Sequence, residues 1–304
     1  MAGPEVGVGV LGTAYVEVDG SPRPLGAAKQ RALLSLLAIH ANQRVSTDTI
    51  VDVLWTDERP AAAVATVRGY VVDLRRVIEP RRARHAASTV LVTEPGGYAL
   101  RIAADCVDAG NLETTVRRAS DRADILGDSW RPAVAAGDRA QATDLAVRLD
   151  EALGRWRGEP LADLGHHPDV QAERDRLCSL RLEAQVLRLR VLIGLHRHAG
   201  AVTDLERLCR ANPWHEHLWA LRSLALAGCG RQVEALAHLR ELRRALADQL
   251  AIDPDPQVAR LETDLIRQDL SGHRDATAVA HGRRFSPSAA RPSTPRRLCR
   301  ASTA

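Results

Sequence analysis

The chain has 304 residues and a formal net charge of +4, and 45% of its residues are hydrophobic but only 3% are aromatic. This length and apolar content exclude a disordered chain and predict two mainly helical domains, because Ala and Leu favour helices over strands. Five scattered cysteines and the lack of an apolar run of about 18 residues exclude a disulfide framework, a zinc knuckle and a membrane span, so we expect a cytoplasmic protein.

The N-terminal segment predicts a small antiparallel sheet followed by a helix. Two β-rich runs, Val6 to Leu11 and Ala14 to Val18, precede the turn dipeptide Asp19-Gly20. The next run, AKQRALLSLLAIHA, has the spacing of a helix with one apolar face. That face is expected to contain Leu33, Leu36, Leu37 and His40.

Two more helices and a hairpin follow in the first hundred residues. Ser46 stands where an N-cap is expected before TDTIVDVLW, and Pro60 suits the first turn of a third helix. The segment STVLVTEPGGYALRI contains two β-rich runs around a turn-forming centre, which predicts a hairpin. The small sheet, three helices and closing hairpin together predict a winged helix over residues 1–102.

Residues 103–270 are predicted to form a second, all-helical domain. Gly and Pro breaks such as Asn212-Pro213 separate its helical segments. The related helix-opening motifs GAVTDLERL and GRQVEAL favour helix pairs of the tetratricopeptide type, with an ordinary helical bundle as the alternative. We expect Trp214 and Trp219 to fill the interfaces between helix pairs.

Residues 271–304 are rich in Arg, Pro, Ser and Ala without apolar periodicity, which predicts a disordered basic tail. This tail holds 7 Lys+Arg against 1 Asp+Glu, whereas residues 1–102 hold 12 against 10 and residues 103–270 hold 23 against 27. Because most of the positive excess lies in the tail, net charge alone does not place a nucleic-acid surface on the folded domains.

Several motifs, in order along the chain, resemble one protein family. The runs PLGAAKQRALLSLLAIHANQRVSTDTIVDVLW, VRGYVVDLRRVIEP and LVTEPGGYAL resemble the winged-helix domain of the Streptomyces antibiotic regulatory protein family. The runs LGRWRGEPLADL and GRQVEALAHLRELRRALADQLAIDPDPQVARL resemble its bacterial transcriptional activator domain. The resemblance spans residues 5–270 and implies an OmpR/PhoB-type domain that binds direct repeats in promoters and a protein that contacts RNA polymerase.

The helix predicted over residues 64–79 has a buried and an outward face. At about 100° per residue, one apolar stripe packs on the core: Val64, Val67, Val71, Leu74 and Ile78. The outward face and its flank contain Ala65, Thr66, Gly69, Asp73 and Arg76, with Arg68, Val72 and Arg75 alongside. Because an α-helix fits the major groove, this outward face is the one that would meet base edges.

We predict DNA contacts by six residues of this helix and the hairpin: Thr66, Arg68, Asp73, Arg75, Arg76 and Thr93. Arginine can fork onto guanine edges or phosphates, and Arg75 and Arg76 match the twin arginines of the family's recognition helix. The alternative interpretation of both is a solvated helix end beside Glu79. Thr66 and Thr93 could reach the DNA backbone or serve as ordinary surface residues.

Three positions depart from the family pattern. Val72 and Asp73 stand where the family commonly has a polar residue followed by Arg, and Glu94 stands where a basic residue is common in the hairpin. A carboxylate facing phosphates is repulsive, although Asp can accept a hydrogen bond from the amino group of cytosine. Gly69 weakens the helix by up to about 1 kcal/mol relative to Ala.

The leading hypothesis is a promoter-binding transcriptional regulator, an activator of a secondary-metabolite gene cluster. Its expected partners are double-stranded promoter DNA, RNA polymerase and, on DNA, a second copy of the chain. The alternative is a helical-repeat adaptor whose winged helix binds protein, which Asp73, Glu94 and the mildly acidic residues 103–270 favour. The sequence contains no P-loop, nucleophile motif or metal-ligand spacing, so we expect no enzymatic activity, cofactor or metal.

Overall fold

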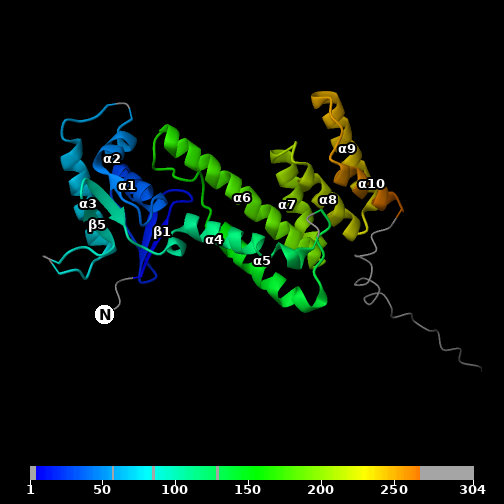
Figure 1. Cartoon of the computed structure of the whole chain (residues 1–304), viewed down its shortest axis with the longest axis horizontal. Helices are drawn as coiled ribbons and strands as arrows, with labels where there is room; N and C mark the ends of the chain where they lie inside the picture. Colours follow the sequence, from blue (N-terminus) through cyan, green and yellow to red (C-terminus); the bar gives the residue numbers. More distant parts are fainter. Residues whose placement is uncertain (1–4, 57, 84–85, 128–129, 268–304) are drawn as a thin grey trace, which may run out of the picture.

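The computed structural model describes residues 5–56, 58–83, 86–127 and 130–267, so the predicted tail of residues 271–304 lies outside the described part of the chain. The described chain is mainly helical, with two small sheets near its N-terminus, which confirms the predicted class. Figure 1 shows α1, α2, α3 and β5 at one end of the molecule, α4 to α6 in the middle and α7 to α10 at the other end.

The first sheet is antiparallel and follows chain order: β1 (Val6–Gly9), β2 (Tyr15–Val18) and β3 (Ser21–Arg23). Asp19 and Gly20 connect β2 to β3 with φ angles of 52° and 71°, which confirms the predicted turn. The sequence did not predict β3, because Pro22 is a poor strand former and all three residues of this edge strand are exposed.

Three helices follow: α1 (Ala28–Ile39), α2 (Thr47–Leu54) and α3 (Ala63–Ile78). The predicted N-cap is confirmed, because the Ser46 hydroxyl accepts a hydrogen bond from the backbone N–H of Thr49 at 3.0 Å. The third helix begins later than predicted, since Pro60 lies in the turn before it. His40 ends α1 and is exposed, so it is not part of the buried face that its spacing predicted.

The predicted hairpin is confirmed as β5 (Leu91–Glu94) and β6 (Gly97–Leu100). The other edge of β6 pairs with β4 (Val45–Ser46), which completes a second three-stranded sheet. A glycine is needed at 97, because a Cβ atom there would lie 2.1 Å from the carbonyl oxygen of Val45. This close approach fixes the hairpin against the start of α2.

The remaining chain is helical: α4 (Asp108–Ser120), α5 (Arg139–Gly154), α6 (Pro168–Gly194), α7 (His198–Ala211), α8 (Glu216–Gly228), α9 (Gln232–Leu250) and α10 (Pro256–Arg267). α9 begins 34 residues after α7, which is the tetratricopeptide period. Trp219 is buried as predicted. The prediction for Trp214 is wrong: it lies in the loop before α8 and is 44% exposed, because helix packing does not reach it.

Two hydrophobic cores divide the molecule, and α6 belongs to both. The first core joins the winged helix to α4, α5 and most of α6, while the second joins the end of α6 to α7 through α10. Leu187 and Val191 face the first core, and Leu189 and Ile193 face the second. The predicted division at residue 102 stays a prediction, and apolar packing continues across that position.

Two buried carboxylates tie the winged helix to the helical region. Asp108, 1% exposed at the start of α4, accepts hydrogen bonds from the backbone N–H groups of Val10 and Leu11 at 2.7 and 3.2 Å. Burial raises the pKa of Asp108, although these bonds and the Arg157 guanidinium act in the opposite direction. Asp163 accepts from the Arg31 guanidinium and from the Ala14 backbone N–H, both at 2.7 Å.

Candidate nucleic-acid interface

Helix α3 has the two faces that its spacing predicted. Four members of its apolar stripe are at most 1% exposed: Val67, Val71, Leu74 and Ile78. Val64 is only half-buried and packs at the margin of the first core. The opposite face presents exposed residues to solvent: Arg68, Gly69, Val72, Asp73 and Arg76. The helix is therefore built to display this face.

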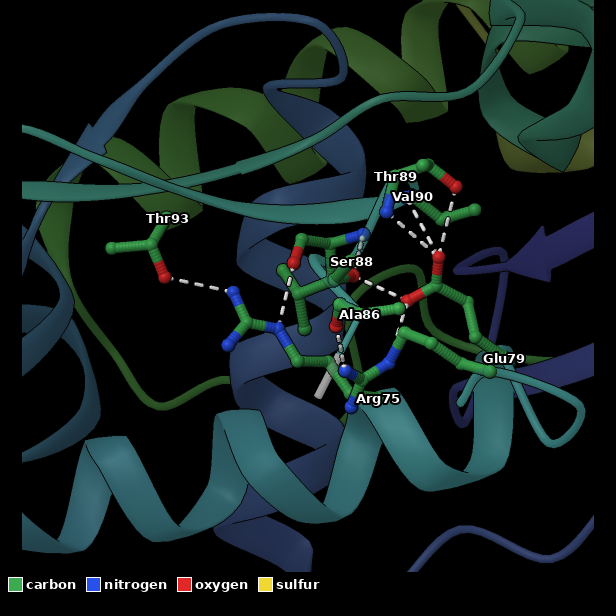
Figure 2. Close-up of polar contacts among 9 residues, drawn as sticks. Arg75, Glu79, Ala86, Ser88, Thr89, Val90 and Thr93 are labelled. Carbon is green, nitrogen blue, oxygen red and sulfur yellow. Dashed lines mark hydrogen bonds and ion pairs between the residues drawn. The ribbon is translucent and has the colours of Figure 1, made fainter. Parts of the chain in front are cut away.

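Arg75 connects α3 to the hairpin beside it. Its Nε donates to the carbonyl oxygen of Leu91 and its Nη2 to the hydroxyl of Thr93, both at 2.8 Å (Figure 2). Burial, and next the charge of Arg82, lower the pKa of the Arg75 guanidinium. Two residues that we predicted to contact DNA are thus in direct contact with each other, at the junction of helix and hairpin.

Glu79 secures the same junction at the end of α3 (Figure 2). Its carboxylate is buried and accepts hydrogen bonds from the Ser88 hydroxyl, from the Thr89 backbone and side chain, and from the Val90 backbone. Burial opposes ionisation, but these bonds together outweigh it and hold the pKa of Glu79 below its ordinary value. Glu79 is thus a buried part of the junction, because the chain after α3 folds back over it, while Arg76 beside it is exposed.

Both acidic departures from the family pattern are paired with arginines. Arg76 Nη1 donates to Asp73 Oδ1 at 2.9 Å on the outward face of α3. On the hairpin, Arg101 Nη2 donates to the carboxylate of Glu94. Each pair has no net charge, so the repulsion between these carboxylates and a phosphate backbone is largely offset.

The other predicted site residues have different surroundings. Arg68 is exposed on α3, and Thr93 is exposed on β5. Thr66 is half-buried, and its hydroxyl donates to the carbonyl oxygen of Ala62 within the helix at 3.0 Å. That bond uses the proton that we expected to reach a phosphate, so Thr66 retains only its acceptor capacity.

The arginine cluster that follows α3 is divided in space. Arg81 is exposed, with its guanidinium 3.9 Å from the Asp19 carboxylate of the first sheet. Arg82 turns inward, donates to the carbonyl oxygen of Ala86 and lies 3.7 Å from the Glu79 carboxylate. Arg84 lies outside the described residues. Of these two described arginines, only Arg81 is well exposed, so the segment after α3 does not present a continuous arginine cluster.

Two arginines that the sequence did not single out border the hairpin. Arg44 donates to the carbonyl oxygen of Pro95 at the hairpin turn at 3.2 Å, and Arg101 donates to the carbonyl oxygen of Asn42 at 2.6 Å. Both are exposed. Strand pairing brings both arginines to the hairpin, because Arg44 lies just before β4 and Arg101 just after β6. In the sequence, only this closeness to predicted strands could have indicated their place in the site.

Neither a metal cluster nor a membrane-spanning helix is found in the part of the chain that the structure describes. No three or more His, Cys, Asp or Glu side chains there are grouped to hold a metal ion. None of the helices between residues 5 and 267 combines the length and the apolar character needed to cross a bilayer.

Two family models match the two halves of the chain. Residues 24–100 match the C-terminal domain of transcriptional regulatory proteins, and residues 126–266 match the bacterial transcriptional activator domain. The first match contains α1 to α3 and the hairpin, and the second contains α5 through α9 and nearly all of α10. The outward face of α3 and the Arg75 junction therefore lie in the matched transcriptional regulatory domain.

Several known regulators are similar to this chain over most of its length. Regulatory protein DnrI of Streptomyces peucetius is 31% identical over 279 residues, which cover 90% of this chain and 96% of DnrI. Transcriptional regulatory protein EmbR of Mycobacterium tuberculosis is 32% identical over 90% of this chain and 67% of EmbR. Regulatory protein AfsR of Streptomyces coelicolor is 38% identical over 86% of this chain, but the chain spans only 24% of AfsR.

A solved structure has the same architecture. The structure of Mycobacterium tuberculosis EmbR in complex with a low-affinity phosphopeptide matches with a TM-score of 0.70 and 28% sequence identity. The match covers 91% of this chain and 70% of that chain, so it includes both the winged helix and the helical region.

Proposed function

Because the chain belongs to the Streptomyces antibiotic regulatory protein family of transcriptional regulators, we propose that it binds promoter DNA sequence-specifically through its winged helix. In this proposal, the outward face of α3 enters the major groove and the β5–β6 hairpin contacts the adjacent backbone. The helical region from α5 to α10 then serves as the surface for other proteins.

One observation carries the proposal: α3 buries four of the five residues of its apolar stripe and displays arginines on the opposite face. A helix of this kind can be inserted into a groove without exposing core residues. The bonds from Arg75 to Leu91 and Thr93 fix the hairpin beside α3, so both elements meet DNA as one surface. Preorganisation of this kind lowers the entropy cost of binding.

The predicted DNA-contacting residues have different proposed roles that follow from their positions on α3 and the hairpin. Arg68 and Arg75 lie on the flank that faces the hairpin, where a groove-bound helix meets phosphates. A guanidinium has five N–H donors, so the two bonds that Arg75 makes within the protein leave donors for a phosphate oxygen. Thr93 acts with Arg75 at the hairpin, and Thr66 is limited to accepting a hydrogen bond.

The finer features of the proposal come from the family. They are binding to direct repeats as a homodimer, contact with RNA polymerase, activation of a secondary-metabolite gene cluster and action in the cytoplasm. Similarity to DnrI and AfsR, which are named regulatory proteins, supports the regulatory role. The continuous core between the winged helix and α4 to α6 supports a fixed geometry between a DNA site and a protein partner.

The alternative function, a protein-binding adaptor, loses its main support. Asp73 and Glu94 favoured it as unpaired repulsive charges, and each is bonded to an arginine instead. Restoring arginine at 73 and 94 would still separate the two functions. A marked gain in DNA affinity would indicate a weakened DNA reader, and an unchanged affinity would support a protein-binding role.

The experiment is a gel-shift titration of the full chain on promoter DNA from its own genome that carries direct repeats. We expect preference over unrelated DNA and a linear fall of log affinity with log salt concentration. Arg68→Ala should weaken binding to all sequences and reduce the salt slope by about 1. Arg148→Ala, which removes the same charge from the exposed face of α5, is the matched control. Absence of any sequence preference at low salt would contradict the proposal.

A further inference from the structure

The centre of the outward face of α3 has few side chains that can form hydrogen bonds. At about 100° per residue, Arg76 lies roughly opposite the stripe that contains Val67 and Leu74, and Ala65 and Gly69 lie on the same line. Within α3, which is described in full, Arg76 is the only residue on this centre line whose side chain can hydrogen-bond. A helix docked by this face would therefore present one polar side chain to the base edges.

The N-terminal part of that centre line carries only small residues, so the helix backbone is accessible there. A Cβ atom at Gly69 would meet no other atom within 4 Å, and Ala65 adds only a methyl group. Small residues let a helix backbone approach a groove closely, and that approach would move Arg76 toward the bases. Arg68 and Arg75 lie off this line, on the flank where phosphates are reached.

Asp73 neighbours Arg76 on the flank away from the hairpin. The Arg76 Nη1 atom donates to Asp73 Oδ1 at 2.9 Å, while the two side chains are 72% and 53% exposed. In water, such an exposed pair is weak. Comparable exposed pairs occur elsewhere, for example Arg148 with Asp144 on α5, so the Asp73 pair is distinctive by its position and not by its strength.

At that position, the bond to Asp73 has a consequence for recognition. It occupies one nitrogen of the guanidinium and limits the rotation of the long side chain, which leaves the remaining N–H groups directed away from Asp73. Two parallel N–H groups match the O6 and N7 acceptors of guanine in the major groove. Contact with DNA removes water from the pair, which strengthens the attraction that holds Arg76 in place.

We propose that Asp73 is a positioning residue that orients Arg76 to read one guanine at the centre of the recognition site. This inference rests on the proposed DNA-binding function and assigns a role to the residue at which the chain departs from its family. Asp73 acts through Arg76 and makes no base contact of its own. The Asp73 carboxylate orients the Arg76 guanidinium, but its negative charge also lowers the sequence-independent affinity of α3 for the DNA phosphates.

The test is selection of binding sites from a pool of random DNA duplexes, carried out with the full chain and four variants. The variants are Arg76→Ala, Asp73→Ala, Asp73→Asn and the matched control Asp144→Ala. The wild-type chain and the control should select a guanine at one shared position. Arg76→Ala should lose preference at that position alone. Asp73→Ala should lower the guanine preference there about tenfold while its affinity for random DNA rises.

The Asp73→Asn variant distinguishes orientation of Arg76 from a general structural effect of residue 73. Its amide oxygen can still accept from Arg76, so it should recover part of the guanine preference that Asp73→Ala loses.

Two outcomes would overturn the inference. One is higher affinity of Asp73→Ala with unchanged preference, which would make Asp73 only repulsive. The other is loss of preference for a cytosine while the guanine persists, which would make Asp73 a direct base contact. If the wild-type chain selects no sequence at all, the DNA-binding function itself fails.

Discussion

The two hydrophobic cores are held together in different ways. In the first core, buried polar groups join segments far apart in sequence, such as Asp108 with Val10 and Asp163 with Arg31. In the second core, helices that follow one another from α7 to α10 pack mainly by apolar contact, and buried polar groups pair between consecutive helices, as His238 of α9 does with Arg222 of α8 and Glu262 of α10 with Arg243 of α9. The two cores therefore differ in the sequence separation of their contacts: long-range polar contacts orient the winged helix in addition to its apolar packing, whereas the repeat half is built from contacts between consecutive helices.

Removing Asp108 should break the first core most severely. Asp108→Ala leaves the backbone N–H groups of Val10 and Leu11 without their acceptor, and Arg157 without its carboxylate. We expect a loss of about 3 to 5 kcal/mol in the free energy of unfolding, measured with urea. Asp144→Ala on the exposed face of α5 should leave the unfolding midpoint nearly unchanged, and equal effects of the two variants would contradict this prediction.

Acid should weaken the second core through His238. Burial, and next the charge of Arg222, lower the pKa of this imidazole to about 4 from an ordinary value of 6.5. Folded His238 resists protonation, so its contribution to stability is complete above pH 6.5 and is lost as the pH falls toward 4, by on the order of 3 kcal/mol. Hydrogen exchange of the α8 and α9 amides at several pH values measures this loss.

His238→Phe is the corresponding variant. A phenyl ring keeps the stack on Trp219, whose ring centroid lies 4.1 Å from that of His238, but cannot take up a proton. The pH dependence of exchange between pH 6.5 and 4 should shrink in this variant. An undiminished pH dependence would mean that another group controls the acid response of the second core.

Neutralising Glu79 tests the junction between α3 and the hairpin. Glu79→Gln replaces a carboxylate oxygen by an amide NH₂ that faces backbone donors, so we expect a loss of about 1 to 3 kcal/mol at pH 7. Because the folded pKa of Glu79 is lowered, its contribution is present above the unfolded value and disappears as the pH falls through the folded value. Wild type and variant should therefore converge in acid, and exposed Glu151→Gln should show no such pattern.

The smallest effect is expected at the second tie between the winged helix and the helical region. Arg31→Ala leaves Asp163 bonded to the Ala14 backbone N–H, so the carboxylate keeps one partner. We expect a loss of about 1 kcal/mol by urea unfolding. Arg23→Ala, an exposed arginine on β3, is the comparison, and a loss as large as that of Asp108→Ala would contradict the proposed ranking of the two ties.

Local patterns in the sequence account for most elements of the fold. The cap at Ser46, the turn at Asp19 and the apolar stripe of α3 each depend on residues within a few positions of one another, so spacing reveals them. The edge strand β3 was missed because Pro22 and three exposed residues give no strand pattern, although it pairs with the adjacent β2, and the late start of α3 was missed because Pro60 suits a first helical turn as well as the turn that precedes it.

The candidate site was only partly predictable for the same reason. Spacing identified the outward face of α3, including Arg68 and Arg76. It did not reveal that Glu79 is buried, because its bonds form only when the segment before β5 folds back onto the end of α3, or that Arg101 neutralises Glu94, because strand pairing in the hairpin brings these two residues together. The Arg75 bond to Thr93 also joins two residues that were predicted as separate DNA contacts.

The length of α6 sets the separation between the winged-helix end of the molecule and the α7 to α10 end. Its 27 residues extend for about 40 Å at about 1.5 Å per residue, and its side chains enter both cores. That span corresponds to about 12 base pairs of B-DNA at about 3.4 Å each. If the winged helix binds DNA as proposed, α6 acts as a spacer: a protein held by α7 to α10 would meet the double helix at a fixed number of base pairs from the bound site, and inserting half a turn of DNA between the two positions would place them on opposite faces of the DNA.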